Sequence, residues 1–242
     1  MAAERLNAWE TLFRHALDIL DSAHRAGSMI RDWSFGGGTV LMRRYRHRLS
    51  TDIDIFLPDP QLLGYLSPRL NPAVESLTSD YIEQANFLKL SFPQGEIDFV
   101  VSGFLTAHPV TTERICHRDV NVETSAEIIA KKIWYRGADF TARDVFDFAL
   151  VATREPTALR HMRDILAARR TVILEHLIDS EEALREDFAA LDVLDFRPSF
   201  EDCVEALRRA LAPSPARPPH RAEQRLARYL VPIRPAVFEI GL

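Results

Sequence analysis

The chain has 242 residues, 47% of them hydrophobic and 27% charged, and its formal net charge at pH 7 is -5. This length allows a full hydrophobic core and two modest domains. The acidic balance excludes a broadly basic coat for nucleic acid but leaves room for a local basic patch.

Cysteine usage and hydropathy set two further bounds. Cys116 and Cys203 are far apart and form neither a CxxC pair nor a dense disulfide framework, so we expect a reduced, cytoplasmic protein. The charged N-terminal segment is unlike a signal peptide, and no uninterrupted apolar run is long enough to cross a bilayer. We therefore expect no membrane partner.

The chain begins with a helical pattern followed by a glycine turn. Apolar residues recur at helical spacing over residues 8–27, and Asn7 with Glu10 has the spacing of a capping box. The sequence GGGT at 36–39 then ends a short strand, and a helix is expected to begin at Thr39. Such a turn lets a phosphate approach backbone N–H groups.

Strand-like segments fill the rest of the first half. RLSTDIDIF at 48–56 predicts a strand, and a helical pattern at 60–77 is expected to be broken by its prolines, Pro68 and Pro72. The segments NFLKLSF and GEIDFVVS are strand-like and joined by the turn signal PQG, and short strands are expected at 110–122.

From about residue 124 the pattern becomes helical to the end, interrupted by APSPARPPH at 212–220, which indicates a linker or loop. The sequence therefore predicts an α+β fold. A mixed sheet in residues 1–122 is expected to carry the chemistry, and residues 123–242 are expected to form a helical C-terminal domain.

Three carboxylates interrupt the apolar strands. Asp52 and Asp54 are two residues apart, so they share one face of their strand, where two like charges need either open solvent or a cation between them. Asp98 is a third acid in an otherwise apolar strand. Each has an ordinary explanation as a solvated strand end, but together they favour a site for Mg²⁺, most simply two ions.

The glycine turn supplies the complementary group. Gly37, Gly38 and Thr39 are expected to hold a phosphate through backbone amides and a hydroxyl. Taken alone, GGGT is more often only a turn. Its order with the following helix, the DxD strand and the later Asp strand favours phosphoryl transfer.

The segments GGT, HRLSTDIDIF, EIDFV and EIIAKKIWYRGADFTARDVFDFA together resemble the AbiEii/AbiGii-type toxin nucleotidyltransferases of the DNA polymerase β-like superfamily. The resemblance covers roughly residues 30–150. It implies a polymerase β-like mixed sheet that transfers NMP from an NTP with Mg²⁺. The residues it assigns are phosphate ligands Gly38 and Thr39, metal ligands Asp52 and Asp54, third acid Asp98, and the later lysine and aspartate, Lys132 and Asp144.

Helical geometry tests the later motif. At about 100° per residue, the isoleucines of residues 125–137 define an apolar arc that includes Lys132 and Arg136 but not Lys131. A lysine on an apolar arc either reaches to the surface or serves a site. We expect Lys132 and Arg136 to face the triphosphate and Lys131 to lie in solvent.

The next helix, TARDVFDFALVA, is apolar around most of its circumference and should be largely buried. Asp144 and Asp147 share its polar flank with Arg143. Two interpretations stay open, a buried Arg–Asp network or contact with Lys132 or the nucleotide. We favour the network for Asp147 and the functional contact for Asp144.

The densest positive stretch consists of Arg43, Arg44, Arg46 and Arg48. It is either a solvated helix face that balances nearby acids or a contact for NTP or RNA phosphates. Arg48 and Ser50 are nucleotide-binding candidates, although Arg48 has the alternative of pairing with the acids. His47 is expected at most to cap the preceding helix.

The sequence thus predicts a Mg²⁺-dependent nucleotidyltransferase in which Asp98 assists deprotonation of the acceptor. The resemblance implies that the acceptor is RNA, with the tRNA 3′ end the leading candidate, and that the protein is the toxin of a toxin–antitoxin or phage-defence system with a cognate antitoxin. Two alternatives are a small-molecule nucleotidyltransferase of the antibiotic type, favoured by the acidic run at 179–188, and a non-catalytic NTP-binding partner module.

Overall fold

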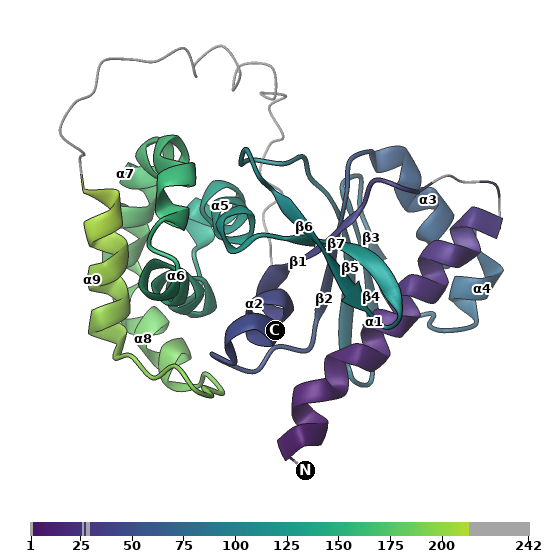
Figure 1. Cartoon of the computed structure of the whole chain (residues 1–242), viewed down its shortest axis with the longest axis horizontal. Coiled ribbons are helices and arrows are strands. Elements are labelled where there is room, and N and C mark those ends of the chain that lie inside the picture. The colour runs from purple at the N-terminus through teal and green to yellow at the C-terminus, as the bar shows by residue number, and fades with distance from the viewer. Residues whose placement is uncertain (1, 26, 28–29, 213–242) are drawn as a thin grey trace. The chain divides into compact units, whose positions relative to one another are not determined.

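The computed structural model describes residues 2–25, 27 and 30–212. Its first half is built around a seven-stranded sheet of order β3-β4-β5-β2-β1-β7-β6 (Figure 1). The strands are β1 (Ser34–Gly36), β2 (Ile53–Leu57), β3 (Tyr81–Glu83), β4 (Phe87–Phe92), β5 (Gly95–Val101), β6 (Val110–Ile115) and β7 (Arg118–Glu123). The pairs β1–β7 and β2–β5 are parallel and the others antiparallel. The predicted mixed sheet is confirmed.

Helix α1 (Ala2–Arg25) covers one face of the sheet. The Phe13 ring lies 4.6 Å from the Phe35 ring, centroid to centroid, and Phe35 stands opposite Ile55 in the register of β1 and β2. Since α1 already begins at Ala2, Asn7 lies inside the helix, and the expected capping box at Asn7 and Glu10 is wrong.

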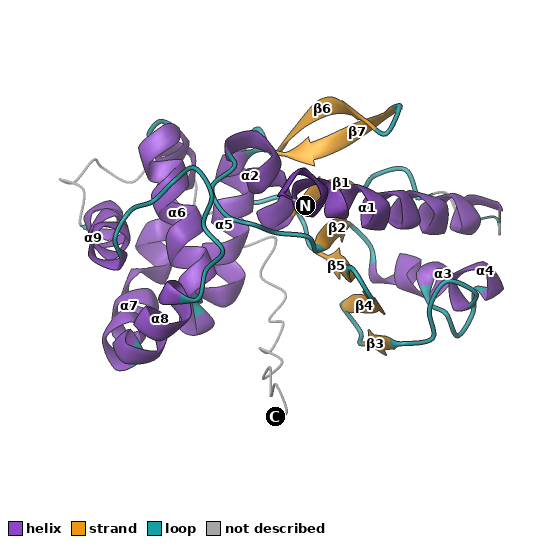
Figure 2. Cartoon of the chain, turned by 90° about the horizontal axis from the view of Figure 1, so that it is seen from below, coloured by secondary structure: helices purple, strands orange, loops and turns teal. Residues whose placement is uncertain are grey.

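The opposite face of the sheet carries the acids. Alternation along β2 buries Ile53, Ile55 and Leu57 and turns Asp54 and Phe56 to the other side. Helices α2 (Gly37–Tyr45) and α5 (Ser125–Arg136) lie on that side, whereas α1, α3 (Leu63–Leu66) and α4 (Pro72–Glu75) lie on the other (Figure 2). The helical pattern at 60–77 is broken at its prolines, as expected, and begins with a 3₁₀ turn at Pro60–Leu62.

The change from strands to helices comes after Glu123. It is followed by α5, a 3₁₀ turn at Gly137–Asp139, α6 (Ala142–Arg154), a 3₁₀ turn at Ala158–Met162, α7 (Arg163–Asp179), α8 (Glu181–Ala189) and α9 (Phe200–Leu211). The Phe146 ring of α6 meets Phe188 and Phe196 edge to face, at 5.6 and 5.4 Å. The Pro-rich stretch at 212–220 lies outside the described residues after position 212, and the boundary between residues 122 and 123 stays a prediction.

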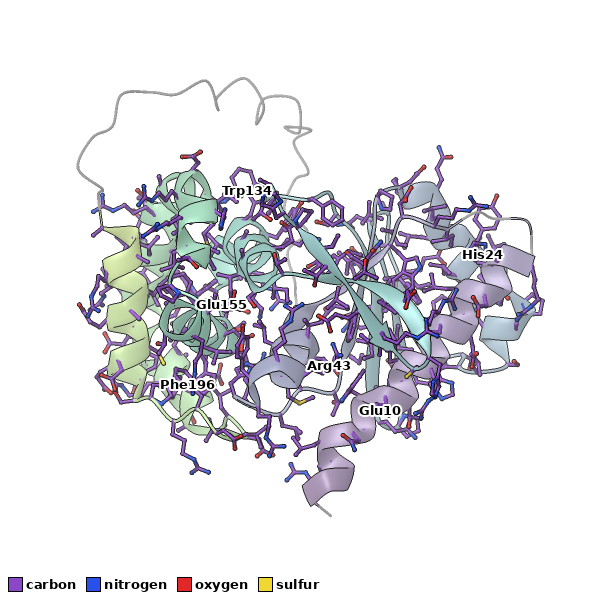
Figure 3. All side chains as sticks on the ribbon, viewed as in Figure 1. Glu10, His24, Arg43, Trp134, Glu155 and Phe196 are labelled. Carbon is purple, nitrogen blue, oxygen red and sulfur yellow. The ribbon has the colours of Figure 1, made fainter. Side chains whose placement is uncertain are left out.

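Contacts between α2 and the helical part join the two halves. Glu155, at the end of α6, accepts hydrogen bonds from Tyr45 of α2 and from Ser125 of α5, the latter at 2.6 Å. Figure 3 shows Glu155 on the helical side and Arg43 of α2 between that side and the sheet. Within the described ranges, no helix is both long enough and apolar enough to cross a membrane.

Candidate active site

The glycine turn brings the N-terminus of α2 against the DxD strand. The helix begins at Gly37, two residues before the expected start at Thr39. Gly37 has a φ of +72°, and a Cβ there would collide with the Asp54 carboxylate, so only glycine fits. The first N–H groups of any helix lack an intrahelical partner, and Gly36 has no side chain to cap those of α2. These N–H groups lie beside the Asp54 carboxylate. This is a position where a phosphate with a bound cation fits.

The Thr39 hydroxyl fastens this turn to the strand. It donates a 2.6 Å hydrogen bond to the backbone carbonyl of Asp52 and lies 3.1 Å from the Ser50 hydroxyl. Thr39 is fully buried, and Ser50 is partly buried. Both hydroxyls therefore hold the turn and the strand together in this structure.

Asp54 and Asp98 are neighbours in the parallel register of β2 and β5 and face the same side. Burial raises the pKa of both carboxyls, that of Asp98 to about 7 with a further contribution from the Asp54 charge. Asp98 Oδ1 is buried and has no partner within residues 2–25, 27 and 30–212, and Asp54 forms no direct ion pair there. With Lys89 in contact with Asp98 only, the two acids are underneutralised.

Asp52 has a different hydrogen-bond partner. It lies just before β2, and its Oδ1 accepts a 3.2 Å hydrogen bond from the Glu96 N–H. Across the part of the chain that is described, no three His, Cys, Asp or Glu side chains come together as a metal-binding group. The Asp52 carboxylate thus contacts the β4–β5 hairpin while its charge helps to raise the pKa of Asp54, and its role as a metal ligand stays a prediction.

Asp54 and Asp98 nonetheless fit a hard cation. They offer carboxylate oxygens, one of them buried and unpartnered, next to an open helix N-terminus. Mg²⁺ prefers such oxygens together with substrate phosphates and water, and does not need an all-protein cage.

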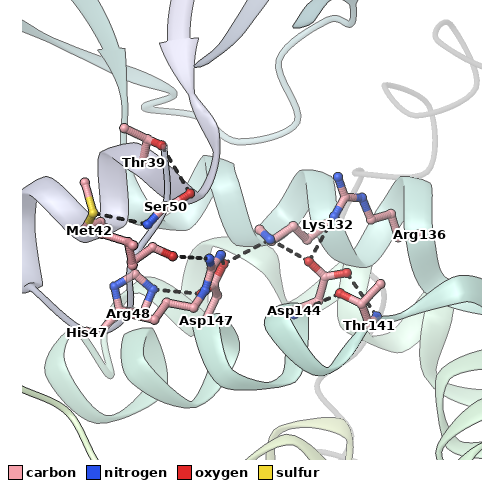
Figure 4. A network of polar contacts seen from close by, with 11 residues as sticks. Thr39, Met42, His47, Arg48, Ser50, Lys132, Arg136, Thr141, Asp144 and Asp147 are labelled. Atoms are coloured by element: carbon pink, nitrogen blue, oxygen red, sulfur yellow. Dashed lines mark hydrogen bonds and ion pairs between the residues drawn. The ribbon is translucent and has the colours of Figure 1, made fainter. Parts of the chain in front are cut away.

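Lys132 and Arg136 lie on one stripe of α5, as expected, and meet Asp144 of α6 (Figure 4). Lys132 Nζ is 2.5 Å from Asp144 Oδ1 and 3.0 Å from Asp147 Oδ2, and Arg136 Nη1 is 3.2 Å from Asp144. Although burial opposes it, these cations lower the pKa of Asp144 to about 2. The charges of Lys132 and Arg136 also oppose the rise in the pKa of Asp54. The electrostatic effect of both side chains therefore reaches the acid pair on the sheet.

Asp144 also caps its own helix. The Thr141 hydroxyl accepts from the Asp144 N–H, and the Asp144 carboxylate accepts from the Thr141 N–H, forming a capping box.

Asp147 is the centre of a buried network. Arg48 donates two hydrogen bonds to it, at 2.7 and 2.8 Å, and His47 Nε2 lies 2.8 Å from the same carboxylate. Arg48 and Lys132 hold the pKa of Asp147 well below its usual value although burial raises it. The network interpretation of Asp147 fits this geometry, but its arginine is Arg48, whereas Arg143 is exposed.

Arg48 supports the glycine turn from behind. Its guanidinium is 5% exposed, and a Cβ at Gly38 would lie 2.6 Å from its Nη2. The remaining arginines of the basic run each have a carboxylate partner. Arg43 and Arg44 pair with Glu113, and Arg46 pairs with Asp195. The run is thus balanced by acids, as one of the two interpretations expected.

The expectation that Lys131 lies in solvent is wrong. Its side chain is 5% exposed, its Nζ lies 2.6 Å from Glu123 Oε1, and the same atom stands 3.6 Å from the centroid of the Phe56 ring. Burial raises the pKa of Glu123 to about 7. Both lysines of the KK pair therefore face inward, toward different partners.

Sequence reasoning also missed Lys89, which contacts Glu96 and lies 3.2 Å from Asp98 Oδ2. A signal was present, because counting back from the PQG turn pairs Lys89 with Asp98 across the hairpin.

The family model described as "Nucleotidyl transferase AbiEii toxin, Type IV TA system" matches residues 26–222, well beyond the region where motifs were found. No curated protein matches the chain significantly.

Among solved structures, the chain is similar to MenT4, a nucleotidyltransferase toxin from Mycobacterium tuberculosis H37Rv (18% identity, TM-score 0.47, covering 84% of this chain and 83% of that one). It is also similar to a protein from H. pylori assigned to the nucleotidyltransferases, with 14% identity and a TM-score of 0.44. That match covers 87% of this chain and 94% of the other. A third similar structure is an antigenic nucleotidyltransferase-like protein from Paracoccidioides brasiliensis, with 16% identity and a TM-score of 0.34. That match covers 75% of this chain and 92% of the other.

The family match spans most of the chain, including the glycine turn, the acid pair and the Lys132–Asp144 contact. The resemblance expected from the motifs is confirmed, and the chain belongs to the AbiEii family of nucleotidyltransferase toxins.

Proposed function

We propose that this enzyme transfers NMP from an NTP to an RNA acceptor in a Mg²⁺-dependent reaction, with the acid pair Asp54 and Asp98 at its centre. The observation that carries the proposal is the placement of these two half-buried, underneutralised carboxylates beside an open helix N-terminus. Such an arrangement is unfavourable until a cation and an anion occupy it together.

The chain's own groups divide the work between the two ends of the NTP. The amides of Gly37, Gly38 and Thr39 bind phosphate oxygens at the start of α2. Lys132 and Arg136 bind the triphosphate from α5, where Asp144 orients them. Asp54 and Asp98 hold Mg²⁺, which supplies neutralising charge to the phosphates when bound.

Asp98 accepts the proton of the acceptor. The acceptor oxygen attacks the α-phosphorus and forms a new P–O bond, while the bond from that phosphorus to the α,β-bridging oxygen breaks and pyrophosphate leaves. Burial raises the pKa of the Asp98 carboxyl to about 7 before a cation binds, and Mg²⁺ in the site would lower it, so that the carboxylate is ready to accept a proton at neutral pH.

The 3′ end of tRNA is the leading acceptor, and a cognate antitoxin is the expected protein partner. Membership of a toxin family supports the antitoxin partner, and the resemblance of the motifs supports the tRNA acceptor. An antitoxin of this kind implies that unchecked transfer harms the cell.

A labelling assay tests the proposal. Purified protein is incubated with Mg²⁺ and each α-labelled NTP, with and without total tRNA, beside Asp54→Asn. The matched control is Asp80→Asn, whose side chain is exposed and forms no bond in the described structure. Transfer of label to tRNA by the wild type and Asp80→Asn only would support the proposal.

A small-molecule acceptor is the second candidate. The observation that favours it is the pairing of Arg43, Arg44 and Arg46 with carboxylates, which leaves this run without an unpaired cation for RNA phosphates. Pyrophosphate release with no label on RNA, in the presence of aminoglycoside-like amines or alcohols, would select it.

A further inference from the structure

Two aromatic rings beside the proposed NTP site are exposed. Phe104 follows β5, the strand of Asp98, and is 50% exposed, and Tyr135 precedes Arg136 on α5 and is 51% exposed. Among Phe, Tyr and Trp in the described ranges, only Tyr65 is similarly exposed, at 46%. An exposed ring gives up the stabilisation that burial would provide, so two at one place call for a ligand.

Both rings are held in place. The Ser102 hydroxyl lies 3.3 Å from the Tyr135 hydroxyl and donates to it. The loop that carries Phe104 is fastened to α5 by the buried Glu127 carboxylate, which accepts from the N–H groups of Leu105 and Thr106, each at 2.8 Å. The Thr106 hydroxyl adds a third bond at 2.6 Å. These hydrogen bonds fix the Tyr135 side chain and the loop that carries Phe104.

Lys131 lies between Phe104 and Phe56 of β2. Its Nζ stands 3.6 Å from the Phe56 centroid and 5.6 Å from the Phe104 centroid. Phe56 follows Asp54 by two residues on β2 and shares its face of the sheet. Lys131 therefore links Phe104 to the face of β2 that carries Asp54.

We propose that Phe104 and Tyr135 bind the nucleobase of the NTP by stacking on its faces. The inference rests on the proposed function, since it takes Lys132 and Arg136 as ligands of the triphosphate. Lys131 and Tyr135 are four residues apart and form one stripe of α5, and Lys132 and Arg136 form the adjacent stripe. A nucleotide whose phosphates lie on the second stripe has its base beside the first.

Stacking accepts any base, because every base has a π-face. The two rings therefore raise affinity for all four NTPs and leave the choice among bases to other contacts.

The test compares ligands with and without a base. Binding of each NTP and of inorganic tripolyphosphate is measured by calorimetry for wild type, Phe104→Ala, Tyr135→Ala and Tyr135→Phe, with Tyr65→Ala as the matched control. We expect Phe104→Ala and Tyr135→Ala each to lose about tenfold in NTP affinity and nothing in tripolyphosphate affinity. Tyr135→Phe keeps its ring and should bind NTPs nearly as the wild type, as should Tyr65→Ala.

Other outcomes separate the inference from the proposed function. Unchanged NTP affinity in both alanine variants would overturn the inference alone, as would an equal loss for tripolyphosphate. Wild-type NTP affinity combined with weaker tRNA binding would assign the rings to the acceptor's base and also overturn it. Wild-type protein that binds neither NTP nor tripolyphosphate would overturn the proposed function and the inference with it.

Discussion

Two aspartate pairs on neighbouring elements have opposite electrostatic states. Asp54 and Asp98 lie on the sheet with raised pKa values, whereas Asp144 and Asp147 lie on α6 with lowered ones. Burial opposes ionisation in all four. The difference comes from cations, because the α6 pair has Lys132, Arg136 and Arg48 in direct contact.

The comparison separates two uses of a buried acid. The α6 pair is already neutralised, so it fixes Lys132 and the turn behind Gly38 and needs nothing more. The sheet pair has only Lys89, in contact with Asp98, so its charge compensation is incomplete and it is a place for a cation that arrives with substrate. Lys132 acts on both acid pairs, because it forms ion pairs with the two acids of α6 and its charge opposes the rise in the pKa of Asp54.

Asp54→Asn should have the largest effect of any variant in either pair. We expect the transfer rate to fall by more than about 10⁴-fold, over 5 kcal/mol of transition-state stabilisation, because the site loses its cation ligand. Stability should be unchanged or higher, since a half-buried carboxylate with a raised pKa is unfavourably placed. Single-turnover rates and thermal unfolding measure both. Full activity would exclude Asp54 from the cation site.

Asp147→Asn should lower the stability of the protein, in contrast to Asp54→Asn. It leaves Arg48 buried without its carboxylate, and breaking a buried pair costs about 3–5 kcal/mol of unfolding free energy. Urea unfolding measures the loss, with Asp187→Asn on the exposed side of α8 as the control. A loss below about 1 kcal/mol would show that the network does not stabilise the fold.

The sequence predicted the parts of this comparison that depend on local pattern. The DxD spacing placed Asp54 on its own face, and helical period placed Lys132 and Arg136 together. Arg48 and Asp147 are bonded across 99 positions, and no local period reports that contact. The expectation that Lys131 lies in solvent was wrong for a related reason. The apolar arc of α5 was taken to be its only buried side, whereas a second side packs on Phe56 and Glu123.

Glu123→Gln should change how stability depends on pH. The folded pKa of Glu123 is about 7, above the unfolded value of about 4.3. Between these values the folded state holds a proton that the unfolded state has released, so stability falls as pH rises through this window. Removing the carboxyl should remove about 2–3 kcal/mol of that fall.

Asp98 contributes to the wild-type slope in the same direction, so the measured quantity is the difference between Glu123→Gln and wild type in urea unfolding from pH 4.5 to 7.5. Parallel profiles for the two proteins would mean that Glu123 stays ionised throughout, held by Lys131.

Lys89→Met should have the smallest effect and tests the comparison most finely. Lys89 is the cation that Asp98 does have, which makes the sheet pair a partial copy of the α6 pair. Without it, Asp98 Oδ2 loses a competing partner, and Mn²⁺ should bind several-fold more tightly in the absence of nucleotide. Calorimetry at pH 8 keeps the wild-type Asp98 carboxyl ionised, since its pKa is about 7; without Lys89 that pKa rises, and Mn²⁺ then has to displace part of the proton.

Arg69→Gln, which removes a cation from an exposed pair with Glu83, is the control and should leave Mn²⁺ affinity as in wild type. At pH 6 the gain from Lys89→Met should disappear, because the isolated carboxyl then takes up a proton instead of the metal. Weaker Mn²⁺ binding at pH 8 would mean that Lys89 orients Asp98 for the cation and does not compete with it. The acids of the two pairs would then both depend on resident cations, and the distinction between them would lie only in how many each has.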